Sequence, residues 1–193
     1  MRPLARRLRN DEFSPVVIGY RSRLQDYAAF ERQVRAAARG LGERPVHLVG
    51  HSLGGLLALA LAAGLAPSSI GRIVLLGSPI GGSLVARRIA ALGPLRVALG
   101  RHAERLITGV SLPPDVKVGM IAGDRPSLPA WGWLHDGPHD GTVALAETWA
   151  DGLSDHLVLP VGHTGLLLDH EVARQISAFL RVGRFDRQRR VKV

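Results

Sequence analysis

Residues 46–55, with the sequence VHLVGHSLGG, decide the fold of this chain. An apolar, β-rich run ends at Gly50, Ser52 follows two residues later, and an apolar helix-forming run continues from Leu56 to Leu65. This order predicts a strand, a sharp turn and a helix, with Ser52 at the apex of the turn. A Cβ atom at position 50 or 54 would collide with the adjoining strand or helix, so the turn favours glycine there.

The predicted turn lifts the hydroxyl of Ser52 clear of the sheet. The amide of Leu53, at the start of the following helix, then points to the place where an oxyanion would form. We expect His51 to pack beside the turn and to border the substrate, without transferring protons. A phosphate-binding loop is excluded, because no lysine follows the glycines.

The motif Gly50-His51-Ser52-Leu53-Gly54-Gly55 resembles the nucleophile elbow of the α/β-hydrolase superfamily, in its lipase and esterase branch. The resemblance extends over nearly the whole chain. It implies an α/β fold, with a mostly parallel, doubly wound sheet of about five strands flanked by helices. It also implies a serine esterase or lipase that needs no cofactor, whose catalytic residues follow the chain order serine, acid, histidine.

Hydrophobic patterning predicts the remaining elements. The predicted strands are residues 14–20, 46–49, 70–76, 115–122 and 156–161. The predicted helices lie within residues 1–13, 25–41, 56–64, 84–107 with a break at 93–94, and 169–183. We expect one domain over residues 1–183, with a small cap at 84–107, and a basic, disordered tail at 184–193.

A serine hydroxyl is a weak nucleophile until a base accepts its proton, and that base is usually a histidine oriented by a carboxylate. The resemblance places the histidine just after the last strand, where His163 lies. His156, at the start of that strand, and His170, inside the next helix, fit this position less well.

The resemblance places the acid between residues 122 and 156. Asp140 is the favoured candidate, because Asp140-Gly141-Thr142-Val143 resembles the D-G-x-V turn that supplies the acid in several lipase-like families. The alternatives are Asp124, Asp136 and Glu147. In the competing interpretation, Asp140 only forms an Asp-Gly turn.

The long loop at residues 123–141 is rich in glycine, proline, histidine and tryptophan, and loops of this length in compact domains are usually functional. Trp131 and Trp133 are candidates for the substrate-binding pocket, although they could equally serve only to anchor the loop. Residues 77–83, GSPIGGS, resemble a turn of bacterial lipases and are expected to form a wall of the site. We expect no metal, because no cluster of ligands has metal-binding spacing.

The composition is that of an ordinary soluble globule. The 193 residues are 46% hydrophobic and 21% charged, contain no cysteine and carry a net charge of +9. The longest apolar run, residues 53–63, is too short to span a bilayer, and the first residues do not resemble a signal peptide. We therefore expect a cytoplasmic protein that acts on a small-molecule ester or lipid and binds no nucleic acid. The oligomeric state stays open.

α/β-Hydrolases usually carry a strand ending in His-Gly before the first helix, and this dipeptide does not occur in the sequence. Two expectations follow from that departure. The alternative function is a catalytically inactive, truncated protein that acts as a binding module. We also expect Met1 to be an internal methionine, with an apolar strand encoded upstream of it.

Overall fold

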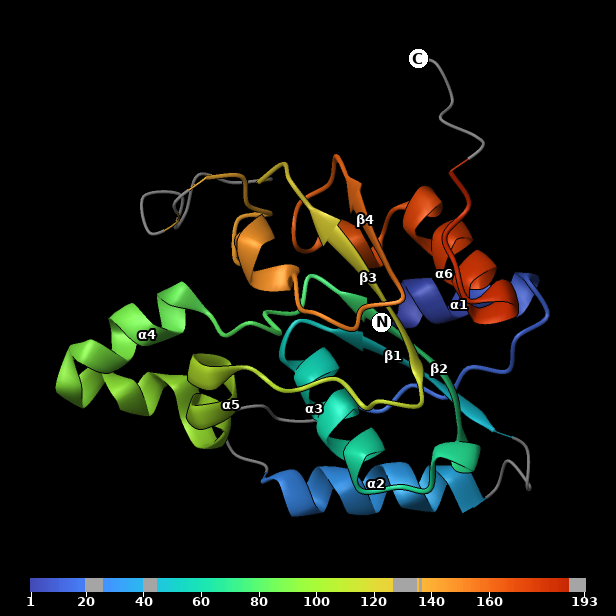
Figure 1. The fold of residues 1–193 in the computed structure, drawn as a ribbon, viewed down its shortest axis with the longest axis horizontal. Helices are drawn as coiled ribbons and strands as arrows, with labels where there is room; N and C mark the ends of the chain where they lie inside the picture. The colour runs from blue at the N-terminus through green and yellow to red at the C-terminus, as the bar shows by residue number, and fades with distance from the viewer. Residues whose placement is uncertain (20–25, 40–44, 127–134, 136, 188–193) are drawn as a thin grey trace.

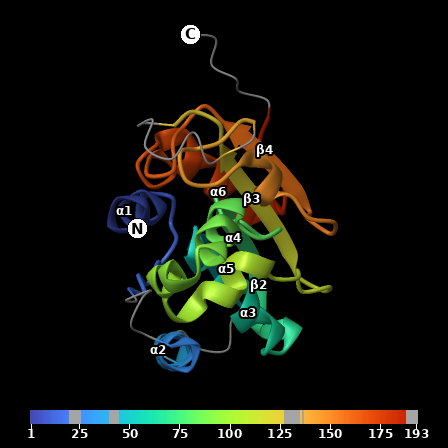
Figure 2. The ribbon, with the colours of Figure 1, turned by 90° about the vertical axis from the view of Figure 1, so that its left-hand side faces the viewer.

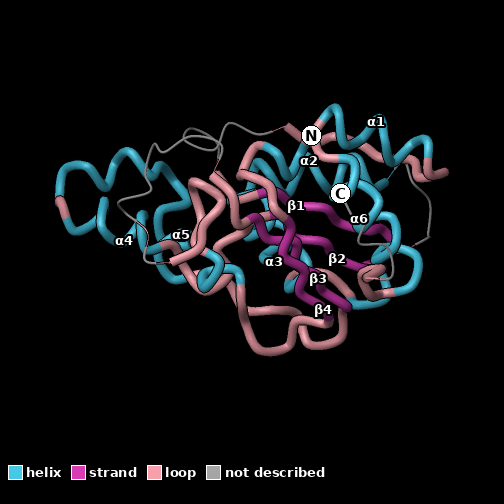
Figure 3. The backbone as a smooth tube through the Cα atoms, turned by 90° about the horizontal axis from the view of Figure 1, so that it is seen from above, coloured by secondary structure: helices cyan, strands magenta, loops and turns pink. Residues whose placement is uncertain are grey.

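The structure is a computed structural model that describes residues 1–19, 26–39, 45–126, 135 and 137–187. Its centre is a parallel sheet in the order β1-β2-β3-β4 (Figure 1). The strands are β1 (Val46–His51), β2 (Ile70–Leu76), β3 (Lys117–Gly123) and β4 (Asp155–Leu159). Seen from above, they lie side by side (Figure 3). The predicted α/β class and the parallel sheet are confirmed.

The prediction of a strand at residues 14–20 is wrong. Ser14 to Gly19 form no strand, and Val16 and Val17 are 52% and 40% exposed. Tyr20 lies outside the described residues. The physical reason is the absence of a neighbouring strand, because a cavity lies between this segment and β1. Apolar, β-branched residues favour a strand only where an edge is available to pair with them.

Helices cover both faces of the sheet, as in doubly wound folds (Figure 1). On one face, α1 (Arg2–Asn10) and α6 (His170–Val182) contact each other and pack against the strands. On the other face, α3 (Leu53–Ala63) packs against β1 and β2. The helix α2 (Tyr27–Arg39) borders the same cavity as α3 and β1.

The core has two parts because alternate side chains of each strand point to opposite faces. In β2, Val74 and Leu76 pack on the side of α1 and α6, whereas Ile73 and Leu75 pack on the side of α3. All four side chains are fully buried. β2 and β3 are therefore the interior strands that hold the site in place.

The predicted helical stretch at 84–107 is broken where the sequence indicates. It comprises α4 (Leu84–Ala91), η2 (Gly93–His102) and α5 (Ala103–Thr108). Gly93 and Gly100 have φ angles of 63° and 69°, which stop a regular helix. In Figure 1 this part extends to the left of the sheet, and in Figure 2 it faces the viewer.

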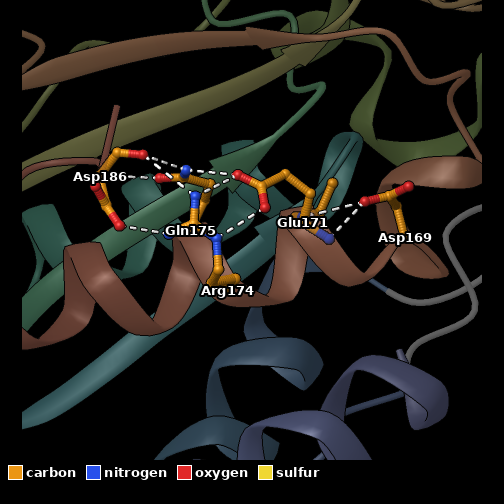
Figure 4. Close-up of polar contacts among 6 residues, drawn as sticks. Asp169, Glu171, Arg174, Gln175 and Asp186 are labelled. Atoms are coloured by element: carbon orange, nitrogen blue, oxygen red, sulfur yellow. Dashed lines mark hydrogen bonds and ion pairs between the residues drawn. The ribbon is translucent and has the colours of Figure 1, made fainter. Parts of the chain in front are cut away.

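The tail is predicted to begin at residue 184, and the structure describes its residues 184–187. Helix α6 ends at Gly183 in a left-handed conformation, as predicted, but Phe185 is only 4% exposed and packs against Phe179. Figure 4 shows the polar contacts that fix this segment: Arg174 binds Glu171 and Asp186. The buried ring of Phe185 holds this part of the chain in place. The sequence does not indicate this burial, because arginines surround Phe185.

Within the described residues, none of the helices combines the length and the apolar character needed to cross a bilayer.

Candidate functional site

Ser52 lies at the apex of the turn between β1 and α3, as predicted. Its φ of 55° and ψ of −129° are rare for a residue with a side chain, and such strain is concentrated at functional sites. A Cβ atom at Gly50 would lie 2.4 Å from the Cα of Gly55. A Cβ atom at Gly55 would lie 2.0 Å from the Oγ of Ser78. The strained turn therefore depends on two close approaches. The sequence predicts the one at Gly50 but not the one at Gly55.

The start of α3 supplies hydrogen-bond donors beside Ser52. Leu53 is the first residue of the helix, and the first amides of a helix have no partner within it. The amide of Ser52 itself donates to the carbonyl of Leu76 at 2.9 Å, which ties the turn to the end of β2. The amide of Leu53 is thus in the part of the turn where an oxyanion could be held.

Asp140 and His163 form a close pair. The distance between Asp140 Oδ2 and His163 Nδ1 is 2.6 Å, and the amide of His163 donates to the carbonyl of Asp140 at 2.9 Å. The carboxylate of Asp140 accepts a hydrogen bond from His163 Nδ1, so Nδ1 carries the imidazole proton. Nε2 is then free to accept a proton. This is the orientation that a general base requires.

The turn around Asp140 holds its carboxylate. Asp140 Oδ1 accepts hydrogen bonds from the amides of Thr142 and Val143 at 2.9 and 2.8 Å, and Asp140 is 2% exposed. Gly141, with a φ of 102°, permits the tight turn. One oxygen of Asp140 is thus bound by its own turn, and the other is free to orient His163.

The end of β2 brings the turn, the acid and the histidine together. Gly77 follows Leu76, and a Cβ atom at Gly77 would lie 2.8 Å from Asp140 Oδ2 and 3.3 Å from His163 Nδ1. The ring of His51 lies 4.5 Å from the ring of His163. All these groups lie at the carboxyl ends of the strands, where α/β sheets bind ligands. Within the described chain, however, no hydrogen bond joins the hydroxyl of Ser52 to His163.

His51 positions the backbone of His163. Its Nε2 lies 3.0 Å from the carbonyl oxygen of His163, which can only accept, so Nε2 carries a proton and donates. Burial, and then the nearby His163, lower the pKa of His51 to about 4. The neutral ring is suited to hold a loop in place and poorly suited to exchange protons near neutral pH.

The alternative histidines have other surroundings. His156 Nε2 lies 2.9 Å from the hydroxyl of Thr148, and the His156 ring packs against Trp149. Burial lowers the pKa of His156. His170 is the first residue of α6.

Among the alternative acids, Glu147 is bound by backbone amides. Its carboxylate accepts hydrogen bonds from the amides of Leu84 and Ala144 at 2.5 and 3.0 Å, and burial raises its pKa. It ties the start of α4 to the loop after Asp140. Asp124 is exposed, and Asp136 lies outside the described residues.

The structure describes only part of the long loop at residues 123–141. Trp131 and Trp133 lie outside the described residues. His135 and His139 stack with their ring centroids 4.6 Å apart. Within the described ranges, no three or more histidine, aspartate or glutamate side chains form a group that could hold a metal ion.

A cavity of about 810 Å³ opens beside the turn. His51, Ser52 and Leu53 line it, together with apolar side chains of α1, α2 and α3 and the segment from Phe13 to Gly19. The sequence does not predict this cavity, because the cavity arises from the distance between residues 14–19 and β1, and the patterns of both segments predict strands of one sheet.

Comparisons with solved structures agree with this fold. A mature lipase from Bacillus licheniformis matches with a TM-score of 0.61 and 18% identity, over 80% of this chain and 71% of that one. A metagenomic carboxyl esterase matches with a TM-score of 0.61 and 17% identity, over 81% of this chain and 62% of that one. The phospholipase PlaB of Legionella pneumophila, in complex with thio-NAD, matches with a TM-score of 0.68 and 14% identity, over 93% of this chain and 55% of that one.

The chain therefore spans less than two thirds of the length of two of these three proteins, and identities this low establish the fold alone. No curated protein matches the sequence. The family model described as "Alpha/beta hydrolase family" matches residues 1–190, almost the whole chain. Together with the parallel sheet and the strained serine between β1 and α3, this match shows that the chain belongs to the α/β-hydrolase family.

Proposed function

We propose that this protein is a serine hydrolase that cleaves carboxylic esters. Ser52 is the nucleophile, His163 the general base and acid, Asp140 the residue that orients His163, and the amide of Leu53 a donor to the oxyanion. The observation that carries the proposal is the 2.6 Å contact between Asp140 and His163, beside the strained turn of Ser52.

The reaction follows from these positions. Ser52 Oγ attacks the ester carbonyl carbon while His163 Nε2 takes the hydroxyl proton, and the amide of Leu53 donates to the resulting oxyanion. When the intermediate collapses, the carbon–oxygen bond of the ester breaks and His163 returns the proton to the departing alcohol. Water then attacks the acyl carbon while His163 Nε2 takes a proton from it. The bond between this carbon and Ser52 Oγ breaks, His163 returns the proton to Ser52, and the acid is released.

The proposed substrate is a small-molecule ester or a lipid. Two of the similar structures are named as a lipase and a carboxyl esterase, which supports this class without identifying the acyl chain or the alcohol. We further propose that residues 84–107 act as the cap, because they extend from the sheet as a separate helical unit (Figure 1). A panel of p-nitrophenyl esters of graded chain length would identify the preferred acyl group.

Labelling with a fluorophosphonate probe tests the proposal. The folded wild-type protein should take up one probe per chain, and Ser52→Ala should take up none. Asp140→Asn should label about 10³- to 10⁴-fold more slowly, because His163 would then be held in the wrong tautomer. The matched control is Asp124→Asn, at an exposed aspartate, which should label at the wild-type rate. Failure of the folded wild-type protein to react would contradict the proposal.

The second candidate function is a catalytically inactive binding module. The observation that favours it is that, among the described residues, the hydroxyl of Ser52 makes no hydrogen bond to His163. Such bonds are often long before substrate binds, so we favour the enzyme. The labelling experiment separates the two candidates, because a binding module would be inert towards the probe with or without Ser52.

A further inference from the structure

Glu147 is a buried carboxylate that the proposed reaction does not use. It lies in the short helical turn η4 (Leu145–Thr148) and is 7% exposed. Among the ion pairs of the described residues, none includes Glu147. Burying a carboxylate without a partner cation costs free energy, so its hydrogen bonds have to compensate for that cost.

The two oxygens of this carboxylate bind two separate segments of the chain. Oε1 accepts a hydrogen bond from the amide of Leu84, the first residue of α4, at 2.5 Å, and Oε2 accepts one from the amide of Ala144 at 3.0 Å. The carbonyl of Glu147 also accepts a hydrogen bond from the amide of Gly81 at 3.0 Å. Glu147 thus joins the start of the proposed cap to the residue that follows the Asp140 turn.

A carboxylate suits this position because two main-chain N–H groups converge on it, and each of them needs an acceptor. The carboxylate offers one acceptor oxygen to each group. A glutamine side chain offers one oxygen and one NH₂ group, and the NH₂ group would face an N–H donor. Glutamine at this position would therefore leave the amide of Leu84 or of Ala144 without an acceptor.

Ala144 carries this restraint into the turn that holds Asp140. The amide of Val143, next to Ala144, donates to Asp140 Oδ1 at 2.8 Å, and the carbonyl of Val143 accepts from the amide of Asp140 at 3.1 Å. His139 and Ala144 pair across the turn in an antiparallel bridge. The same turn directs Asp140 Oδ2 to His163. A shift of Ala144 therefore moves the carboxylate that orients His163.

We propose that Glu147 is a positioning residue of the site. Through Ala144 it fixes the turn of Asp140, and through Leu84 it couples that turn to the start of the cap. This inference rests on the proposed function, in which Asp140 orients His163. In the purely structural alternative, Glu147 only satisfies the first amide of α4, which has no partner within the helix. The two accounts differ in whether the hydrogen bond between Asp140 and His163 responds to changes at Glu147.

The first measurement is the low-field proton resonance of His163 Nδ1, which reports the hydrogen bond to Asp140 and requires no catalytic activity. In Glu147→Gln this resonance should move upfield or broaden, because a displaced Asp140 carboxylate binds the proton more weakly. The matched control is Thr148→Val, in the same turn η4, which removes the hydrogen bonds of the hydroxyl to Leu145 and His156. It should lower the melting temperature and leave the His163 resonance unchanged.

Leu84→Pro tests the same contact from the side of the cap, and it serves if Glu147→Gln does not fold. Proline lacks the amide that Glu147 accepts, and it is well tolerated at the first position of a helix. The φ of −88° and ψ of 123° at Ser83 suit a residue before proline. Compared with Leu84→Ala, which keeps the amide, Leu84→Pro should shift the His163 resonance in the same direction as Glu147→Gln does.

The second measurement is the rate at which the fluorophosphonate probe labels Ser52. Glu147→Gln should label about 10²-fold more slowly than wild type, the cost of misplacing a reacting group by about 1 Å. In the Asp140→Asn background, Glu147→Gln should cause no further loss, because Glu147 acts through Asp140. A wild-type protein that shows the resonance but takes up no probe would contradict the proposed function alone, since the response of the resonance to Glu147→Gln still tests the positioning role.

Four results would overturn the role of Glu147. An unchanged His163 resonance in both Glu147→Gln and Leu84→Pro would reduce Glu147 to a helix cap. An equal shift in Thr148→Val would assign the effect to a general loosening of η4. Losses that multiply in the double variant would show that Glu147 does not act through Asp140. Absence of the resonance in the wild-type protein would show that the hydrogen bond which Glu147 is proposed to position is not formed.

Discussion

Ser52 holds its rare backbone conformation because Gly50 and Gly55 allow other atoms to approach closely. Gly55→Ala would place a Cβ atom 2.0 Å from the Oγ and 2.8 Å from the Cβ of the fully buried Ser78. We expect Gly55→Ala to lower the free energy of unfolding by about 1–3 kcal/mol, the usual cost of overpacking. Thermal and urea unfolding would measure it.

Two companion variants identify the cause. Gly64→Ala should leave the stability unchanged or slightly raised, because its Cβ atom would lie 3.6 Å from the carbonyl of Leu61. Adding Ser78→Ala to Gly55→Ala should recover part of the loss, since the nearest clashing atom is then removed. Equal stability of Gly55→Ala and wild type would contradict the steric account.

Individual residues of the site differ in how far sequence could predict them. The serine turn, Asp140 and His163 carry local patterns, and the structure brings the acid and the histidine into contact. Their catalytic roles stay predictions until they are tested. The hydrogen bond from His51 to the carbonyl of His163 could not be predicted, because it joins residues 112 positions apart through the fold.

At the scale of elements, α6 shows how one side chain sets a helix start. Asp169 accepts hydrogen bonds from the amides of Glu171 and Val172 at 2.7 and 3.2 Å (Figure 4). Asp169→Ala should lower the free energy of unfolding by about 1 kcal/mol, the usual value for an N-cap. Urea unfolding would measure it, with Asp115→Ala at an exposed position as the control. Equal losses in both variants would contradict a capping role.

The segment after α6 gives a second prediction at this scale. Phe185 is 4% exposed, and its ring centroid lies 5.0 Å from that of Phe179. Phe185→Ala should therefore cost about 3 kcal/mol of stability, as for other buried aromatic residues. Val182→Ala, at a 58% exposed position, should cost less than about 0.5 kcal/mol. An unchanged melting temperature in Phe185→Ala would instead support a tail that is disordered from residue 184.

Sequence predicted the four observed strands well because each is an apolar run bounded by turn residues. It was wrong at residues 14–20 for a physical reason: the pattern reports which residues suit a strand, whereas a strand also requires a neighbour. The segment Ser14–Gly19 has the composition of a strand but faces a cavity.

At the scale of the whole molecule, the titratable groups that folding buries make stability depend on pH. Burial lowers the pKa values of His47, His51 and His156, in the case of His51 from 6.5 to about 4. Each of these histidines binds a proton more readily in the unfolded chain than in the folded one. Their contribution to stability is therefore complete above pH 6.5 and is lost as the pH falls towards the folded pKa values.

Two other effects act in the same pH range. Burial raises the pKa of Glu147, so its contribution is present at low pH and is lost as the pH rises through its folded pKa. The net charge of +9 becomes more positive on acidification, and self-repulsion then destabilises the fold. Salt screens repulsion between exposed charges but has less effect on the cost of protonating a buried histidine.

The difference between wild type and His51→Gln isolates one histidine from these effects. Glutamine can still donate to the carbonyl of His163 but does not titrate. The wild-type melting temperature should fall more steeply than that of His51→Gln between pH 6.5 and about 4, and the difference should persist at high salt. Differential scanning calorimetry at each pH would measure it. Parallel curves for the two proteins would show that His51 is protonated equally in both states, and that its burial does not contribute to the acid sensitivity of the fold.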